Sequence, residues 1–156
     1  MTRGKAGDDD DEIERIARGL LDLSLPKPEW THRAHFAAAL WLLAHPEVLA
    51  HEGGMAPIIR RYNEATGVAN TNSGGYHETI TQASLSGAAA YLAQADRGTL
   101  TAVLARLMAG PLGDKRWPLT YWSEGRLMSA RARRNWLEPD IAPLPWPLLA
   151  QSGEAR

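Results

Sequence analysis

The chain has 156 residues, of which 44% are hydrophobic, and this length suits one globular domain with its own core. Its formal net charge of −1 gives no overall reason to expect nucleic acid or an anionic membrane as a partner. It contains no cysteine, which excludes disulfides, thiolate nucleophiles and zinc–thiolate sites. The N-terminal stretch lacks the apolar core of a signal peptide, and the longest apolar run, residues 36–44, is too short for a bilayer, so we expect a cytoplasmic protein.

The first predicted helix begins in the acidic run at residues 8–12, after a disordered arm at residues 1–7. Apolar residues then recur at three- and four-residue steps, and Pro26 and Pro28 end the segment. We expect the resulting stripe to be buried. It consists of Ile13, Ile16, Leu20 and Leu23.

The second predicted helix follows Trp30, with Thr31 as its N-cap, and ends before Pro46. Because residues 36–44 are apolar on every side, we expect other helices to surround it. A third helix is predicted from about Pro57 to Gly67. Its buried face consists of Ile58, Ile59, Tyr62 and Ala65.

A fourth helix, residues 77–95, follows the turn-rich loop at residues 68–75. Its many Ala, Ser and Gly residues would allow another backbone to pack closely against it. A fifth helix is predicted at residues 100–108. Residues 137–147 contain too many prolines for a helix and predict an extended strap, packed over the body by Ile141, Leu144 and Trp146. The sequence therefore predicts an all-α bundle of about five helices in one domain, residues 8–150, with a short tail at residues 151–156.

Three of the five histidines lie in two short stretches, WTHRAH at residues 30–35 and GYHETIT at residues 75–81. Each stretch joins a polar loop to an apolar helical segment, which places the imidazoles on first helical turns. His32 and His35 are three residues apart and so share a helix face. The positive end of the helix dipole favours the neutral imidazole, which a metal ligand or a general base requires. Capping or simple packing would also explain such histidines.

The second stretch adds His77 and Glu78, and helical steps from His77 reach Thr81 and Ser84. The leading hypothesis is a small-molecule enzyme with one divalent metal that activates water or dioxygen. Its ligands would be His32, His35, His77 and Glu78, and its catalytic residues His77, Glu78 and Thr81. Nitrogen and oxygen ligands leave zinc, iron(II) and manganese open, and no organic cofactor is indicated. Glu78 could also be only a favourable charge near the start of its helix.

Two alternatives remain open. The first is a metal-free isomerase, lyase or cyclase, in which His77 pairs with Glu78 or His35 as acid and base. Its substrate contacts would be Tyr76, Asn72, Thr79, Thr81 and Arg126. The second is a non-enzymatic binding or regulatory module that uses the basic, aromatic region at residues 115–134. Aromatic residues at this spacing more often anchor a core, so nucleic acid is not favoured, although some of the six tryptophans could form a homodimer surface.

Three segments together resemble a family of small, uncharacterised bacterial proteins. They are WTHRAHF, RRYNEATGVANTNSGGYHETIT and YWSEGRLMSARARRNWLEPDIAPLP, and the resemblance extends from about Lys27 to Pro145. It implies no particular activity, cofactor or catalytic residue.

Overall fold

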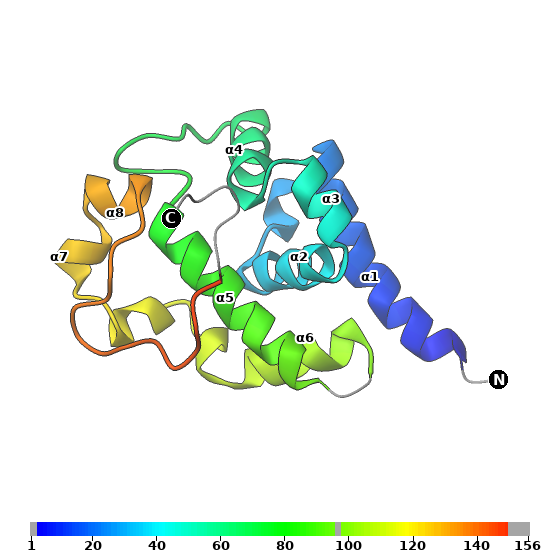
Figure 1. Ribbon diagram of the computed structural model, residues 1–156. Coiled ribbons are helices and arrows are strands. Elements are labelled where there is room, and N and C mark those ends of the chain that lie inside the picture. Colours follow the sequence, from blue (N-terminus) through cyan, green and yellow to red (C-terminus); the bar gives the residue numbers. More distant parts are fainter. Residues whose placement is uncertain (1–2, 96–97, 150–156) are drawn as a thin grey trace.

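Eight α-helices and three short 3-10 helices, with no strand, form the part of the chain that the computed structural model describes, residues 3–95 and 98–149. The five longer helices correspond to the five predicted ones (Figure 1). They are α1 (Arg3–Asp22), α2 (His32–Ala44), α4 (Met55–Ala65), α5 (Glu78–Gln94) and α6 (Leu100–Ala109). The shorter elements are η1 (Lys27–Glu29), α3 (Pro46–His51), η2 (Pro111–Gly113), η3 (Trp117–Thr120), α7 (Glu124–Leu127) and α8 (Ala130–Arg134). The predicted all-α, single-domain fold is confirmed.

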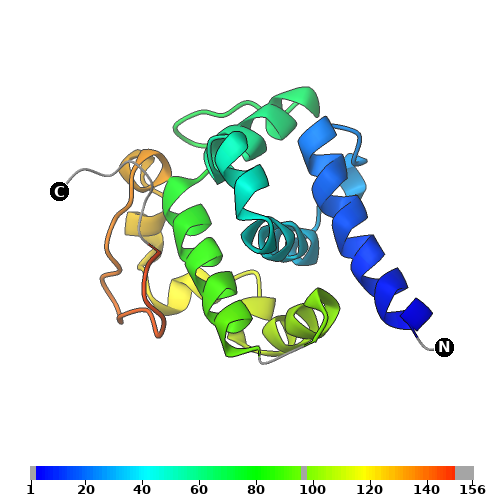
Figure 2. The same ribbon diagram turned by 45° about the vertical axis from the view of Figure 1, so that its right-hand side comes forward.

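Helix α2 is the central helix of the molecule. It contacts α1, α3, α5 and α6, and Figure 2 shows it nearly end-on between α1 and α5. Every side chain at residues 36–42 is buried, which explains why this helix can be apolar on all sides. Thr31 caps it as predicted, because its Oγ1 accepts a hydrogen bond from the backbone N–H of Ala34 at 3.1 Å.

Helix α1 starts earlier than the acidic run predicts. Residues 3–7 are helical, so the expected disordered arm is wrong for them, and residues 1–2 lie outside the described part, as do residues 150–156 with the predicted tail. Extending an existing helix needs no new nucleus, which favours this extra turn. The acidic run consequently lies inside the helix, where the Asp10 carboxylate accepts hydrogen bonds from the N–H groups of Leu100 and Thr101 at 3.3 and 3.0 Å. These bonds hold the start of α6 against α1.

The predicted burial of Leu23 and Ala65 is wrong, because both lie at helix ends. Helix α1 ends at Asp22, and Leu23 turns into the left-handed region with φ 70° and is 42% exposed. The N–H of the buried Leu25 then bonds to the Gly19 carbonyl at 3.1 Å, so Leu25 enters the core in its place. Ala65, the last residue of α4, is exposed.

The C-terminal strap packs against the small residues of α5. A Cβ added at Gly87 would lie 3.0 Å from the indole of Trp146, tighter than an ordinary contact, so the absence of a side chain there lets the strap approach closely. The backbone N–H of Leu149 donates to the Ser86 hydroxyl at 2.9 Å. Close packing thus accounts for the composition of this helix face, as predicted.

Farther back along the strap, the predicted anchoring by the side chain of Ile141 is wrong. Ile141 is 59% exposed, because the strap is held there by its backbone, whose N–H donates to the Tyr121 carbonyl at 2.8 Å. Leu144 and Trp146 do pack against the core. A search of the described helices found none that is long and apolar enough to cross a membrane.

Candidate functional site

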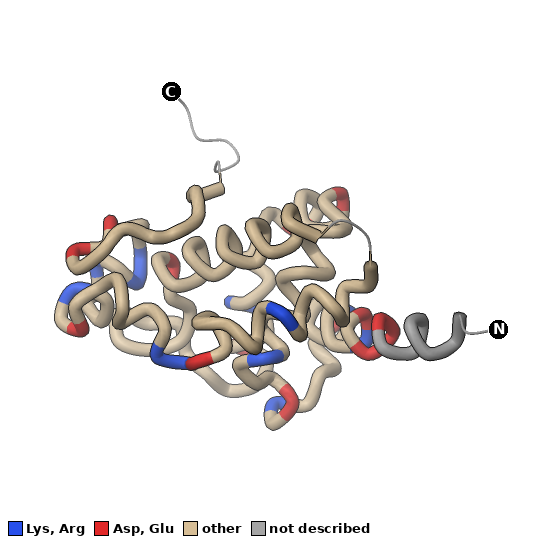
Figure 3. The backbone as a smooth tube through the Cα atoms, turned by 90° about the horizontal axis from the view of Figure 1, so that it is seen from below, with Lys and Arg blue, Asp and Glu red and all other residues tan. Residues whose placement is uncertain are grey.

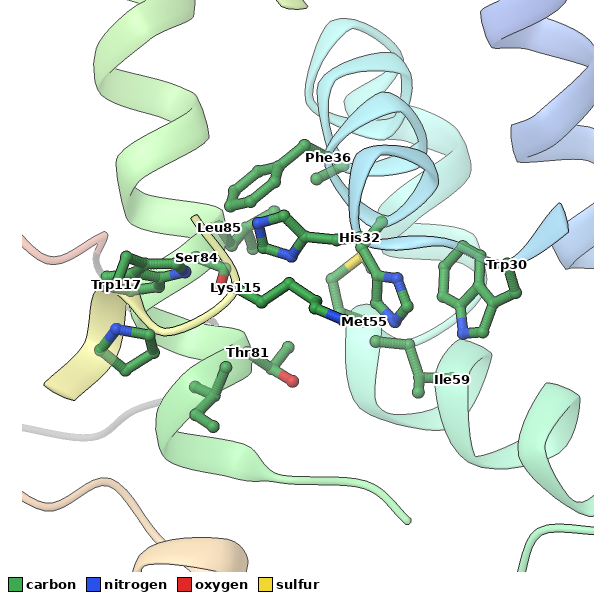
Figure 4. A pocket seen from close by; sticks show the side chains of 14 residues that line it. Trp30, His32, Phe36, Met55, Ile59, Thr81, Ser84, Leu85, Lys115 and Trp117 are labelled. Carbon is green, nitrogen blue, oxygen red and sulfur yellow. The ribbon is translucent and has the colours of Figure 1, made fainter. Parts of the chain in front are cut away.

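A pocket of about 320 Å³ opens between α2, α4, α5 and the start of η3. Figure 4 shows side chains from these elements facing one another: His32 and Phe36, Met55 and Ile59, Thr81, Ser84 and Leu85, and Lys115 with Trp117. Its walls are mainly apolar, and the polar side chains among the lining residues are His32, His35, Thr81, Ser84 and Lys115. Small-molecule sites have this character and start at about this volume, roughly 300 Å³.

His77 has no ring nitrogen free for this pocket. Its Nδ1 accepts a hydrogen bond from the Ile80 N–H at 3.1 Å and so caps α5, and its Nε2 donates to the Leu127 carbonyl oxygen at 2.7 Å. A neutral imidazole has one N–H and one lone pair, and both are used here. Burial lowers the pKa of His77, and the Arg133 guanidinium lowers it further, which keeps the ring neutral. His77 therefore ties α5 to α7.

His32 has one ring nitrogen engaged. Its Nε2 donates to the Leu112 carbonyl oxygen at 2.8 Å, and its ring meets Phe36 edge to face, with 5.3 Å between centroids. The lone pair is then on Nδ1, which has no hydrogen-bond partner among the described residues. The bond to Leu112 fixes the ring orientation on one wall of the pocket.

His35 is the histidine whose lone pair is best placed for chemistry. Its Nδ1 donates to the Thr31 carbonyl oxygen at 2.7 Å, one helical turn back, and its ring stacks on Trp30 with 3.8 Å between centroids. Nε2 is consequently the lone-pair nitrogen, at the ring edge away from the helix backbone, with no partner among the described residues. Desolvation by the surrounding helices lowers the pKa of His35, and nearby His32 lowers it further, although by surface area the residue is exposed.

A second hollow of about 360 Å³ adjoins the pocket and brings the two histidine stretches together. The residues that line both are Trp30, His35, Ile59, Ile80 and Thr81. The second hollow also includes Tyr76, whose hydroxyl donates to Glu78 Oε1 at 2.7 Å. Burial and the Glu78 carboxylate raise the pKa of Tyr76, so this phenol stays protonated.

The four predicted metal ligands do not converge. No three His, Asp or Glu side chains among those that the structure describes, at residues 10–95 and 98–149, are grouped so that they could hold a metal ion. His77 uses both ring nitrogens, and the two Glu78 oxygens accept from Tyr76 and from Gln82 at 2.7 and 3.2 Å. In this arrangement the imidazole lone pairs left for a ligand are those of His32 and His35.

The predicted substrate contacts Thr79, Asn72 and Arg126 line neither the pocket nor the hollow beside it. Thr79 is fully buried, with its hydroxyl 2.7 Å from the Ala132 carbonyl, and accepts from the Leu137 N–H at 3.1 Å. Asn72 accepts from Arg134 at 3.3 Å, and Arg126 donates to the Glu138 carbonyl at 2.7 Å. All three tie segments of the fold together. Thr81, in contrast, lines both cavities.

The sequence indicated Lys115 only as the start of the basic region at residues 115–134, and the structure makes it a pocket residue. It lies in the loop between η2 and η3, and Figure 4 shows its side chain extending into the pocket. The adjacent acid, Asp114, accepts a hydrogen bond from the backbone N–H of Arg116 at 2.9 Å and so stabilises the turn. Nearby Leu112 is held against α2 by its hydrogen bond from His32, a long-range contact that no local pattern in the sequence reports.

The basic region at residues 115–134 does not form one continuous segment of surface. Figure 3 shows the Lys and Arg positions of the described chain spread over several segments, with Asp and Glu positions between them. Arg133 donates to the Gly75 carbonyl at 3.1 Å, and the rings of Trp117 and Trp122 are buried in the core. Core packing and internal hydrogen bonds thus account for several residues of this region.

No protein-family model, curated protein sequence or solved structure matches this chain. The resemblance to small bacterial proteins stays a prediction, and function has to be argued from the pocket itself.

Proposed function

We propose that this chain is a small-molecule enzyme in which the neutral imidazole of His35 acts as a general base on a substrate held in the apolar pocket. The observation that carries the proposal is the hydrogen bond from Nδ1–H to the Thr31 carbonyl, which leaves the Nε2 lone pair on the free edge of a pocket-lining ring. This is the metal-free reaction class predicted above, an isomerase, lyase or cyclase, with His35 in place of His77 as the base.

The surroundings of His35 suit proton abstraction. Its lowered pKa keeps the ring unprotonated at neutral pH, and stacking on Trp30 holds the ring in place. A positioned base of this kind contributes about 10²- to 10⁴-fold to a rate. The hydroxyls of Thr81 and Ser84 on the facing wall would orient a polar atom of the substrate.

A metal-dependent form of this function, with zinc, iron(II) or manganese, stays a prediction from the sequence. The two remaining imidazole lone pairs, on His35 and His32, would be its first ligands. Inductively coupled plasma mass spectrometry on the wild-type protein and the His35→Ala variant tests it. Stoichiometric metal that is lost in the variant would support the metal-dependent form over the metal-free one.

Nitrobenzisoxazole, a small, flat and apolar molecule, tests the proposed base directly. A base that removes its ring C–H proton drives cleavage of the N–O bond, so that a nitrile forms and the oxygen leaves as a coloured phenolate. We expect saturable turnover in the wild-type protein and its loss in His35→Gln. The rate should rise with pH through an apparent pKa below 6.5 and then stay level, because the pKa of His35 is lowered from 6.5.

His45 provides a matched control. Like His35, it donates from Nδ1 to the carbonyl one turn back, at 2.8 Å from Trp41, and it stacks on a tryptophan, with 3.9 Å between centroids. It does not line the pocket. His45→Gln should therefore retain full turnover. No saturable turnover in the wild type, or equal turnover in the His35→Gln variant, would contradict the proposed role of His35.

A further inference from the structure

The charge of the pocket walls restricts the ligand. Among the described residues that line the pocket and the adjoining hollow, the side chains that can carry a charge at acidic to neutral pH are Lys115, His32, His35 and His77, and none is Asp or Glu. A cationic ligand would find no counter-ion in these walls, and burial of an unpaired charge is unfavourable. The walls therefore select against cations.

Lys115 makes the pocket favour anions. The three ion pairs of the described residues do not include it, and its neighbour Asp114 bonds to the backbone of the turn. Its ammonium group extends into a pocket whose other walls include Phe36, Met55 and Leu85 (Figure 4). Lys115 is itself exposed, and the apolar walls beside its ammonium group would make it attract an anion more strongly than a lysine on an open surface does.

The aromatic walls indicate the shape of the apolar part. Trp30, Phe36 and Trp117 all line the pocket, and aromatic faces and edges favour contact with a flat ring. We propose, as an inference that rests on the proposed function, that the substrates are small aromatic monocarboxylates. The ring lies among Phe36, Met55 and Trp117, and the carboxylate pairs with Lys115.

Three probes with the same ring system and different charge test the class: naphthoate, naphthylmethanol and naphthylmethylammonium. Isothermal titration calorimetry at neutral pH and low salt measures their affinities. We expect naphthoate to bind about tenfold more tightly than the alcohol, a difference of about 1.4 kcal/mol, because its carboxylate would form a charge-assisted hydrogen bond with Lys115. The ammonium probe should bind most weakly, and added salt should reduce the preference for naphthoate.

Variants of two neighbouring residues, Lys115 and Arg116, locate the charge. Lys115→Met removes the ammonium group from a chain of similar length and should reduce naphthoate to the affinity of the alcohol, whereas Lys115→Arg should keep the preference. Arg116→Gln is the matched control, because Arg116 is the next residue, is exposed and does not line the pocket. Ser84→Phe, which fills the pocket from α5, should abolish binding of naphthoate and of the alcohol.

The proposed class would be overturned if the three probes bind equally well or if none of them binds. It would also be overturned if the preference for naphthoate survives Lys115→Met, or if naphthoate binding survives Ser84→Phe. His35→Gln separates this result from the proposed base. If the anion preference holds while proton abstraction fails in the wild type, only the base is refuted. If His35-dependent proton abstraction holds while the preference is absent, only the substrate class is refuted.

Discussion

Replacing His77 by alanine tests whether this residue stabilises the fold or carries chemistry. The wild-type ring caps α5 through Nδ1, 3.1 Å from the Ile80 nitrogen, and donates through Nε2 to the Leu127 carbonyl at 2.7 Å. Alanine removes both bonds and leaves two backbone groups in a buried region without partners. We therefore expect a large loss of unfolding free energy.

The magnitude follows from the two bonds. Loss of a helix N-cap costs about 0.5–2 kcal/mol. A buried carbonyl without a partner costs about 1–3 kcal/mol. The expected loss for His77→Ala is then roughly 2–4 kcal/mol, allowing for partial relaxation of the surrounding backbone. This is a large fraction of the stability of an ordinary domain, about 5–15 kcal/mol.

Urea unfolding followed by circular dichroism measures this loss. The His77→Asn variant separates the contribution of the helix cap from that of the bond to Leu127. Asparagine is a good N-cap and can accept from the Ile80 N–H, but its side chain is too short to reproduce the imidazole bridge to Leu127. We expect His77→Asn to recover about 1 kcal/mol of the loss, with the same urea dependence in all variants. His45→Gln, a histidine outside this bridge, serves as a control for the loss of an imidazole.

A loss below about 0.5 kcal/mol in His77→Ala would refute the reasoning, because surface substitutions alone give that much. Equal losses in the alanine and asparagine variants would refute the capping role and leave only the bond to Leu127. If the His77→Ala protein is folded and fully stable but has lost catalytic activity, that result would instead support the catalytic role of His77 that the sequence predicts.

Three further predictions concern backbone geometry, a buried hydroxyl and pH. Gly75→Ala should lower the unfolding free energy by at least about 1 kcal/mol in thermal melts, because φ is 81° and an added Cβ would lie 2.5 Å from a backbone carbonyl oxygen. Gly125→Ala is the control, since open space surrounds that position. Equal effects of the two substitutions would contradict the argument. Thr79→Val keeps the shape and removes a fully buried hydroxyl, so a urea titration should show a loss of about 1–3 kcal/mol, and a neutral result would refute the structural role. Because the pKa values of His35 and His77 are lowered in the folded chain, the unfolded chain binds more protons than the folded one below about pH 6.5. The unfolding free energy should therefore be at its full value above that pH and fall as the pH drops below it. Urea titrations that show rising stability on acidification would be inconsistent with both shifts.

The longer helices were predictable because their signals are local. The apolar run of α2, the Thr31 cap and the small-residue face of α5 each depend on residues within a few turns of one another. Helix α3 was missed because Pro46 was interpreted as a stop. It is also the first residue of the next helix, a position that proline favours, since it has no N–H to leave unsatisfied there.

The candidate site was predictable only in part. Its histidines stand out in the sequence, but the Nε2 atoms of His77 and His32 bond to carbonyl groups far away along the chain. His77 meets Leu127, 50 residues on, and His32 meets Leu112, 80 residues on. Partners of this kind leave no periodicity, so the sequence could not distinguish the structural histidine from the one with a free lone pair. Lys115 reaches the pocket for the same long-range reason.

Trp117, which lines the pocket, packs from behind against Trp146 of the strap, with 5.8 Å between ring centroids. The wall therefore depends on specific side-chain packing between segments of low regularity, and not on the helices as such. A compact acid state that keeps its helices and loses fixed packing would retain its far-ultraviolet circular dichroism and lose the cavity. Ligand binding to this pocket would thus act as a sensitive indicator of native side-chain order, one that secondary-structure signals alone would miss.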